Sequence, residues 1–234
     1  MKFDWQQADT HAFYRYDSFD GIVGVERWRA LVERASSFAG PSERGDASIA
    51  GAFADFIAGL DGDSPAAPPT LAPHGQHRPT CCVFISHRRN DIKDALNIAT
   101  HATQAGYDYW LDIHDPTLRA LGDADIASPA KDILLAAAIE IALLNSTHVI
   151  ALHTQHSIVS PPKTLSKWIP YELGRAKARQ ISSKQAACWF DQQTKPNDCG
   201  EYVYLVHHTY SLGDVDNWLA SAPKDRCSVR AKKV

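Results

Sequence analysis

The sequence predicts an α/β fold in which a parallel β-sheet is covered by helices on both faces. Two observations lead to this prediction. After residue 80, short apolar runs with β-prone residues alternate regularly with helical segments that carry an apolar face. The runs are short and apolar, as expected of strands buried on both faces of a sheet. The length of 234 residues accommodates one such domain of about 150 residues and a smaller appendage.

The elements of this domain follow one another in a strand–helix order. Helices are expected at 91–104, 133–144, 166–180 and 215–220, and Gly106 is expected to end the first of them. A polar loop is expected from residue 112 to about 132, after the second strand. Strands are expected at 82–85, 107–111, 148–152, 186–190 and 202–206. We take the strand order to be 2-1-3-4-5, the order of an open doubly wound sheet of five strands.

The residues before this domain form a separate region. Two helices are expected at 25–38 and 47–60, because apolar residues recur there at spacings of three and four. A segment at 61–80 with five prolines is interpreted as a linker. The predicted division is therefore a helical N-terminal extension at 1–60, the linker at 61–80, the main domain at 81–222 and a tail at 223–234. A purely structural role of the extension and a regulatory or assembly role both stay open.

Composition limits the partners of the chain. The formal net charge of −3 does not suggest nucleic acid or an anionic membrane as a partner. No stretch reaches the roughly 18 apolar residues of a membrane span, and the first residues lack a signal-peptide pattern, so we expect a cytoplasmic protein. The five cysteines include no C-x-x-C pair, which favours buried thiols over disulfides. We expect no metal and no cofactor.

Ligand binding is expected where the first and third strands end, because doubly wound sheets bind ligands at that crevice. Two polar segments, 86–91 and 153–172, enter it. Ser86 and His87 are compact donors at the strand end, and Arg88 and Arg89 could hold a pyrophosphate together with the amides that open the next helix. An arginine pair on a solvated helix start explains the same residues equally well. No G-x-S-x-G motif surrounds Ser86, so a hydrolase triad is not expected.

A second feature pairs an aromatic side chain with a carboxylate. In a helix, Trp168 and Glu172 would stand one turn apart on one face. An indole can pack on a flat ring, and a carboxylate can stabilise the positive charge that develops on a ribose during glycosidic cleavage. Pro170 suggests that the helix begins near residue 169, because proline fits only the first turn. From spacing alone, a core tryptophan and a surface acid are the favoured interpretation.

Together, these motifs resemble a family. The run Val83-Phe84-Ile85-Ser86-His87 followed by Asp91, and the later Ser166-x-Trp168-x-x-x-Glu172-Leu173, are similar to a bacterial TIR domain of the enzymatic kind, over about residues 81–222. The resemblance implies a flavodoxin-like sheet and places Glu172 on the catalytic glutamate and Trp168 on the tryptophan of the W-x-x-x-E motif. It also implies a substrate cleft lined by Phe84, Ser86 and Arg88.

The resemblance further implies that NAD is the substrate and no separate cofactor is needed. Such enzymes release nicotinamide, and the ADP-ribose part is hydrolysed or closed into a cyclic signal. Bacterial examples commonly serve antiviral defence and signalling, where a downstream effector can respond to the product. Neighbouring TIR domains can complete an active site, so self-association into a homo-oligomer is expected.

One segment departs from the family pattern. The loop at 112–122 lacks the R-D-x-x-P-G sequence of receptor TIR domains, which counts against an animal-type signalling adaptor. Asp112 and Asp115 of this loop are further candidate site residues, as is Arg89. Two alternatives stay open: a non-catalytic TIR-like interaction module, and another N-glycosidic enzyme similar to nucleoside deoxyribosyltransferases.

Overall fold

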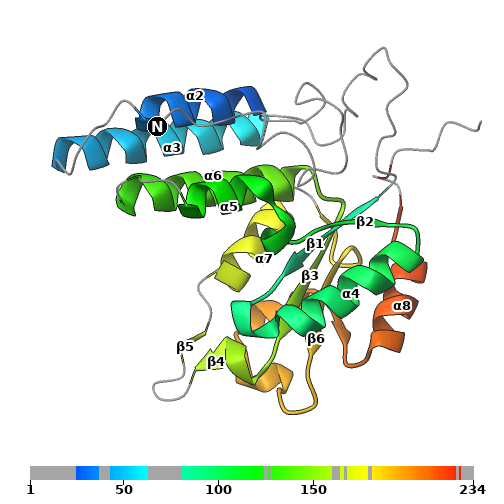
Figure 1. Ribbon diagram of the computed structural model, residues 1–234. Coiled ribbons are helices and arrows are strands. Elements are labelled where there is room, and N and C mark those ends of the chain that lie inside the picture. The colour runs from blue at the N-terminus through cyan, green and yellow to red at the C-terminus, as the bar shows by residue number, and fades with distance from the viewer. Residues whose placement is uncertain are drawn as a thin grey trace, which may run out of the picture. The chain divides into compact units, whose positions relative to one another are not determined.

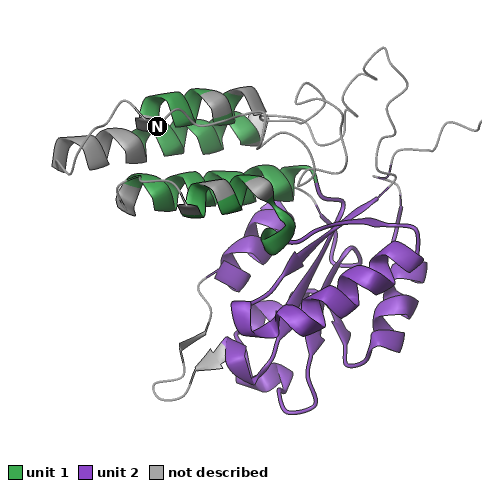
Figure 2. Cartoon of the chain, viewed as in Figure 1, with its two compact units in different colours: residues 1–78, 112–145 green, residues 79–111, 146–234 purple. Residues whose placement is uncertain are grey.

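The computed structural model divides into two compact units (Figure 2). Unit 1 lies within Met1–Arg78 and Asp112–Asn145, and unit 2 within Pro79–Leu111 and Ser146–Val234. The residues that the structure describes are 25–36, 43–62, 81–123, 126, 128–159, 164–165, 168–178, 181–224 and 227. Most of the predicted linker, at 63–80, and most of the predicted tail lie outside these residues.

Unit 2 contains a five-stranded parallel sheet in the order β2-β1-β3-β6-β7, seen at the centre of the unit in Figure 1. In chain order this is 2-1-3-4-5, the order of a flavodoxin-like doubly wound sheet, so the predicted fold class is confirmed. The strands are β1 (Cys82–Ser86), β2 (Asp108–Trp110), β3 (His148–His153), β6 (Ala186–Phe190) and β7 (His207–Thr209).

Helices cover both faces of this sheet within unit 2. Helices α4 (Ile92–Gln104) and α8 (Leu212–Ser221) share one hydrophobic cluster with Val83 and Ile85 of β1. Side chains alternate along a strand, so Phe84 and Ser86 face the opposite side, where α7 (Trp168–Ala178) lies. Gly106 adopts a φ of +81° just after α4, which fits its predicted role as the end of that helix.

Short elements connect these layers. They are the 3₁₀ helices η2 (Arg89–Asp91), η4 (Gln155–Ser157), η5 (Pro196–Asp198) and η6 (Glu201–Leu205), and the antiparallel pair β4 (Ile158–Val159) and β5 (Thr164–Leu165).

Two predicted elements are wrong. Residues 202–205 of the predicted strand 202–206 belong to the 3₁₀ helix η6, and the last strand is β7, which begins at His207. The composition of this run is β-prone, but Tyr204 and Leu205 are exposed rather than packed in the sheet. The predicted loop at 112–132 contains η3 (Asp112–His114), α5 (Pro116–Asp123) and the start of α6 (Ser128–Leu144). Pro116 is the first residue of α5, where its missing N–H costs nothing.

Unit 1 is helical in its described part. Helices α2 (Val25–Ser36) and α3 (Glu43–Gly62) pack against each other and against α6, which also contacts α5. The buried side chains are mainly aliphatic and aromatic, such as Trp28 of α2, Phe56 of α3 and Leu134 of α6. The packing groups 112–145 with the N-terminal helices, whereas the sequence analysis grouped these residues with 81–222.

One cysteine prediction is wrong, because Cys81 and Cys227 form a disulfide. A sequence separation of 146 residues conceals their proximity, which arises because the residue before β1 and the residues after α8 meet at one end of the same core cluster. Cys82, Cys188 and Cys199 are thiols, and the first two are buried as predicted. None of the helices in the described ranges is long and apolar enough to cross a membrane.

Candidate functional site

The candidate site lies at the carboxyl ends of β1 and β3. From these central strands the sheet extends to β2 on one side and to β6 and β7 on the other. The chain segments that leave β1 and β3 therefore run in opposite directions along the sheet. The register pairs Ser86, the last residue of β1, with Ala151 of β3. The loops that follow both strands therefore emerge side by side, at the position where such sheets bind ligands.

Glu172 points from α7 toward the end of β1. The buried face of α7 is formed by Ile169, Glu172, Leu173 and Ala176, so a carboxylate occupies an otherwise apolar helix face. Its side chain is 7% exposed, and the hydroxyl of Ser86, itself 2% exposed, donates a hydrogen bond to Glu172 Oε2. This bond gives the buried carboxylate the polar partner that it requires. Two predicted site residues are thus in direct contact.

Trp168 is the first residue of α7, one position earlier than expected. Pro170 therefore lies in the first turn, where an N–H would have no partner within the helix. The indole is 46% exposed and packs edge-on against Tyr171, with ring centroids 5.8 Å apart. Trp168 and Glu172 are one turn apart, but the indole lies at the surface while the carboxylate is buried.

Phe84 does not line an open cleft in this structure. Its side chain is fully buried and stacks on Trp110 of β2, with ring centroids 4.5 Å apart and an interplanar angle of 14°. Phe84 lies two residues before Ser86 and on the same face of the sheet, so its packing supports the position of Ser86. A direct role of Phe84 in substrate binding stays a prediction.

Hydrogen bonds tie the loop after β1 to the loop after β3. Arg88 donates from a guanidinium nitrogen to the carbonyl oxygen of His156, over 2.6 Å. The hydroxyl of Thr154 donates to Asp91 Oδ1 over 2.8 Å and accepts from the backbone N–H of His156 over 3.0 Å. The two loops therefore form one polar network beside the ends of the strands. Arg89 is exposed at the start of η2.

Asp91 is an acid of this network that the sequence analysis named as a helix start and as part of the family motif, but not as a site residue. Burial raises its pKa above the ordinary value of 3.8, although the hydrogen bond from Thr154 opposes that effect. Its Oδ2 atom has no hydrogen-bond partner in the described part of the chain. Thr154 and His156 were not singled out either. Their position directly after a buried strand, inside the predicted segment 153–172, is the signal that could have identified them.

His87 and His153 lie near the same strand ends. His87 is half-buried, and its Nδ1 is 3.3 Å from the carbonyl oxygen of Ile85. His153 ends β3 and is buried, stacked on Phe190 with ring centroids 5.3 Å apart. Burial, and to a smaller extent the nearby His208, lower the pKa of His153 from 6.5 to about 4. His153 is therefore neutral at pH 7.

The two acids predicted after the second strand belong to unit 1. Asp112 begins η3, and its carboxylate accepts a hydrogen bond from the backbone N–H of Ile113 over 2.6 Å. Asp115 is buried, and its Oδ1 accepts hydrogen bonds from the backbone N–H groups of Thr117 and Leu118 over 2.8 and 3.2 Å. Asp115 thus caps the start of α5. Its contacts are those of a structural residue.

A comparison with protein families found none that matches the chain, and a comparison with curated proteins found no match either.

Proposed function

We propose that unit 2 is a TIR-like enzymatic domain that cleaves the nicotinamide–ribose bond of NAD, with Glu172 as the catalytic carboxylate. The observation that carries the proposal is the burial of Glu172 on the sheet-facing side of α7, hydrogen-bonded to Ser86 at the end of β1. This places a carboxylate beside the crevice at which doubly wound sheets bind nucleotides. The motifs around Ser86 and Glu172 resemble those of the enzymatic TIR domains.

The chemistry of the reaction suits such a carboxylate. Departure of nicotinamide leaves positive charge on the ribose, and a negative group held nearby stabilises that charge most effectively where water is excluded. The hydrogen bond from Ser86 orients the carboxylate. Ribose hydroxyl groups are also donors, so a bound ribose could replace Ser86 as a partner of Glu172.

The loop after β1 supplies groups for the pyrophosphate of NAD. Arg88 now donates to a neutral carbonyl oxygen of His156, whereas a pyrophosphate would offer it a charged acceptor and a stronger bond. Arg89 and the amides at the start of the following helix would add further donors. Trp168 is half-exposed and offers an aromatic surface for a flat ring. NAD is the substrate in this proposal, and the chemistry requires no separate cofactor.

The remaining features of the proposal derive from the family resemblance. The product is ADP-ribose or a cyclised form, neighbouring copies associate through unit 2, and a downstream effector responds to the product. The biological setting is cytoplasmic signalling or antiviral defence.

A non-catalytic interaction module is the second candidate. The full burial of Phe84 favours it, because packing against Trp110 explains this residue without a substrate. A deoxyribosyltransferase-like activity would use the same carboxylate, Glu172. The bond between Arg88 and His156 favours this alternative in one respect, since a nucleoside requires no arginine to hold a pyrophosphate.

The test is turnover of NAD by the full chain at concentrations that allow self-association. Nicotinamide release is measured by chromatography, products are identified by mass spectrometry, and nucleosides are offered in parallel. We expect Glu172→Gln to lower the rate by about 100-fold or more. Glu201→Gln is the matched control, because Glu201 is an exposed glutamate of η6. Equal turnover by Glu172→Gln and the wild type would refute the catalytic assignment, and preference for nucleosides would favour the transferase.

A further inference from the structure

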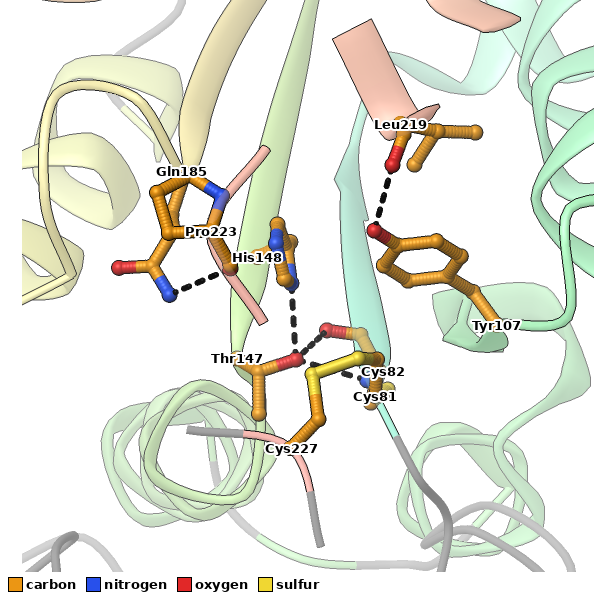
Figure 3. Close-up of a disulfide and its surroundings, with 9 residues drawn as sticks. All are labelled: Cys81, Cys82, Tyr107, Thr147, His148, Gln185, Leu219, Pro223 and Cys227. Carbon is orange, nitrogen blue, oxygen red and sulfur yellow. Dashed lines mark hydrogen bonds between the residues drawn. A yellow bond between two sulfur atoms is a disulfide. The ribbon is translucent and has the colours of Figure 1, made fainter. Parts of the chain in front are cut away.

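A second group of side chains with ligand chemistry lies at the opposite end of the strands (Figure 3). Cys81 directly precedes β1, His148 begins β3, and Cys227 follows α8. The two sulfur atoms and a ring nitrogen of His148 all lie within 4.8 Å of one another. Ser86 and the loop after β3 are at the carboxyl ends of the same strands, so this group is separate from the site of Glu172.

His148 is held in one orientation by its surroundings. Its side chain is fully buried, and its ring packs edge-on against Tyr107 and Trp218, with ring centroids 5.1 and 6.0 Å away. Its Nδ1 lies 2.9 Å from the hydroxyl oxygen of Thr147. That hydroxyl is itself fixed, because it accepts from the N–H of Cys82 over 2.8 Å and donates to the carbonyl oxygen of Cys82 over 3.0 Å. Such an outer contact orients an imidazole for metal binding.

The two cysteines differ in their exposure. Cys81 is buried, whereas Cys227 is only partly buried. Both side chains meet the same core cluster, in which the Cys81 sulfur is bonded to that of Cys227. Reduction of this bond would leave two thiols beside one imidazole.

We propose that Cys81, His148 and Cys227 form a redox-gated metal site, closed as a disulfide when oxidised and able to bind one thiophilic ion such as Zn²⁺ when reduced. Two thiolates and one imidazole are three ligands of a tetrahedral zinc site, and water completes the fourth position. Tetrahedral Zn–S bonds of about 2.3 Å hold two sulfurs about 3.8 Å apart. The disulfide already holds both sulfur atoms beside the imidazole, and its reduction frees them to separate to that distance.

Charge balance also suits this location. Two thiolates neutralise the charge of Zn²⁺, so the complete site carries no net charge. A neutral complex avoids most of the cost of placing an ion beside aromatic side chains such as Tyr107 and Trp218.

The two states exclude each other, because a sulfur in the disulfide is not a thiolate. A dithiol reductant transfers two electrons and two protons to the Cys81–Cys227 bond and becomes a cyclic disulfide. Binding of the metal then releases both thiol protons to solvent. Oxidation of the cysteines in the presence of a disulfide oxidant reverses the sequence and releases the ion.

The test uses Co²⁺ as a spectroscopic probe and the full chain. The protein is reduced with a dithiol, freed of the reductant under anaerobic conditions and titrated with Co²⁺, and the bound ion is then displaced with Zn²⁺. We expect one tightly bound Co²⁺ per chain with thiolate-to-cobalt charge-transfer absorption. The oxidised wild type should lack this absorption and regain it on reduction, a comparison that requires no substitution.

Variants identify the ligands. Cys227→Ser is expected to weaken Co²⁺ binding by about 100-fold or more, since loss of an outer-sphere contact alone costs 10- to 100-fold. Cys199→Ser, which removes a thiol outside the group, should leave it unchanged. His148→Phe keeps an aromatic ring between Tyr107 and Trp218 and should weaken binding by at least about tenfold. Absence of binding by the reduced wild type, or unchanged affinity in Cys227→Ser or His148→Phe, would overturn the proposal. None of these outcomes depends on turnover of NAD.

Discussion

Replacing His153 by phenylalanine is expected to remove a defined part of the acid sensitivity of unit 2. His153 is 1% exposed, and neither ring nitrogen has a hydrogen-bond partner in the described part of the chain. Burial first, and then the nearby His208, lower its pKa from 6.5 to about 4. Phenylalanine preserves an aromatic ring that can stack on Phe190 and contact Tyr202.

The sign and size of the effect follow from proton linkage. Between about pH 4 and 6.5 the unfolded chain binds a proton at His153 that the folded chain does not bind. The part of the free energy of unfolding that depends on a neutral His153 is therefore fully present above pH 6.5 and is lost as the pH falls through this window. With each pKa unit equivalent to about 1.4 kcal/mol, the wild type should lose about 2 kcal/mol between pH 7.5 and 5 from this group. The His153→Phe variant should not show this loss.

The assay is urea unfolding of both proteins at several pH values between 5 and 7.5, followed by circular dichroism. The quantity of interest is the change with pH in the difference between the two free energies of unfolding, so a uniform effect of the substitution on packing cancels. His207→Phe, at an exposed position of β7, is measured in parallel as a control for loss of an imidazole. A difference that stays constant within about 0.5 kcal/mol across this range would refute a neutral, buried His153.

Three further predictions concern the same unit. Under oxidising conditions, Cys227→Ser should lower the free energy of unfolding by about 2–5 kcal/mol, because the disulfide closes a loop spanning 146 residues; with a reductant and a chelator present, urea unfolding should show little difference from the wild type. Asp91→Asn should be more stable than the wild type at pH 7, because burial raises the pKa of Asp91 and the ionised form is disfavoured, while the amide oxygen can still accept from Thr154. Protonated Asp91 stabilises the fold at low pH, and this stability is lost as the pH rises through the raised pKa. The stability difference between Asp91→Asn and the wild type, measured by thermal unfolding, should therefore close as the pH is lowered toward 4. Tyr107→Phe removes the 2.7 Å hydrogen bond to the carbonyl oxygen of Leu219 and should cost about 1–3 kcal/mol in urea unfolding.

Four of the five strands of the sheet were accessible from the sequence, because buried parallel strands combine β-prone residues with turn residues at their ends. Their order was assumed from the doubly wound fold and from the family resemblance. The run at 186–190 illustrates this, since β6 begins and ends at the predicted residues. The run at 202–206 failed for the opposite reason. Its residues have strand-like composition, but they lie beside the edge strand β7, and Tyr204 and Leu205 contact solvent. Composition therefore succeeded where both faces of a run are buried.

Long-range contacts were less accessible. The Cys81–Cys227 bond depends on the meeting of chain segments 146 residues apart, for which local periodicity holds no information. The grouping of α6 with α2 and α3 has the same origin, because a strongly apolar helix such as α6 does not indicate which neighbour it packs against. Similarly, Arg88 and His156 were assigned to neighbouring loops, but the hydrogen bond between them follows only from the register of β1 and β3.

Glu172 shows which local signal could have identified the site without a family resemblance. Ile169, Leu173 and Ala176 form an apolar stripe on α7, and Glu172 lies inside this stripe rather than opposite it. The W-x-x-x-E spacing drew attention to the distance between Trp168 and Glu172. It did not show that Glu172 lies on the buried face of the helix. An acid within a buried stripe requires a polar partner in the layer beneath it. Ser86, the hydroxyl that ends the otherwise apolar stretch Val83–Ile85, was the side chain of β1 able to serve. A polar residue within each of two apolar stretches thus implied the contact between α7 and β1. This contact is a candidate catalytic site because it lies at the carboxyl end of a central strand.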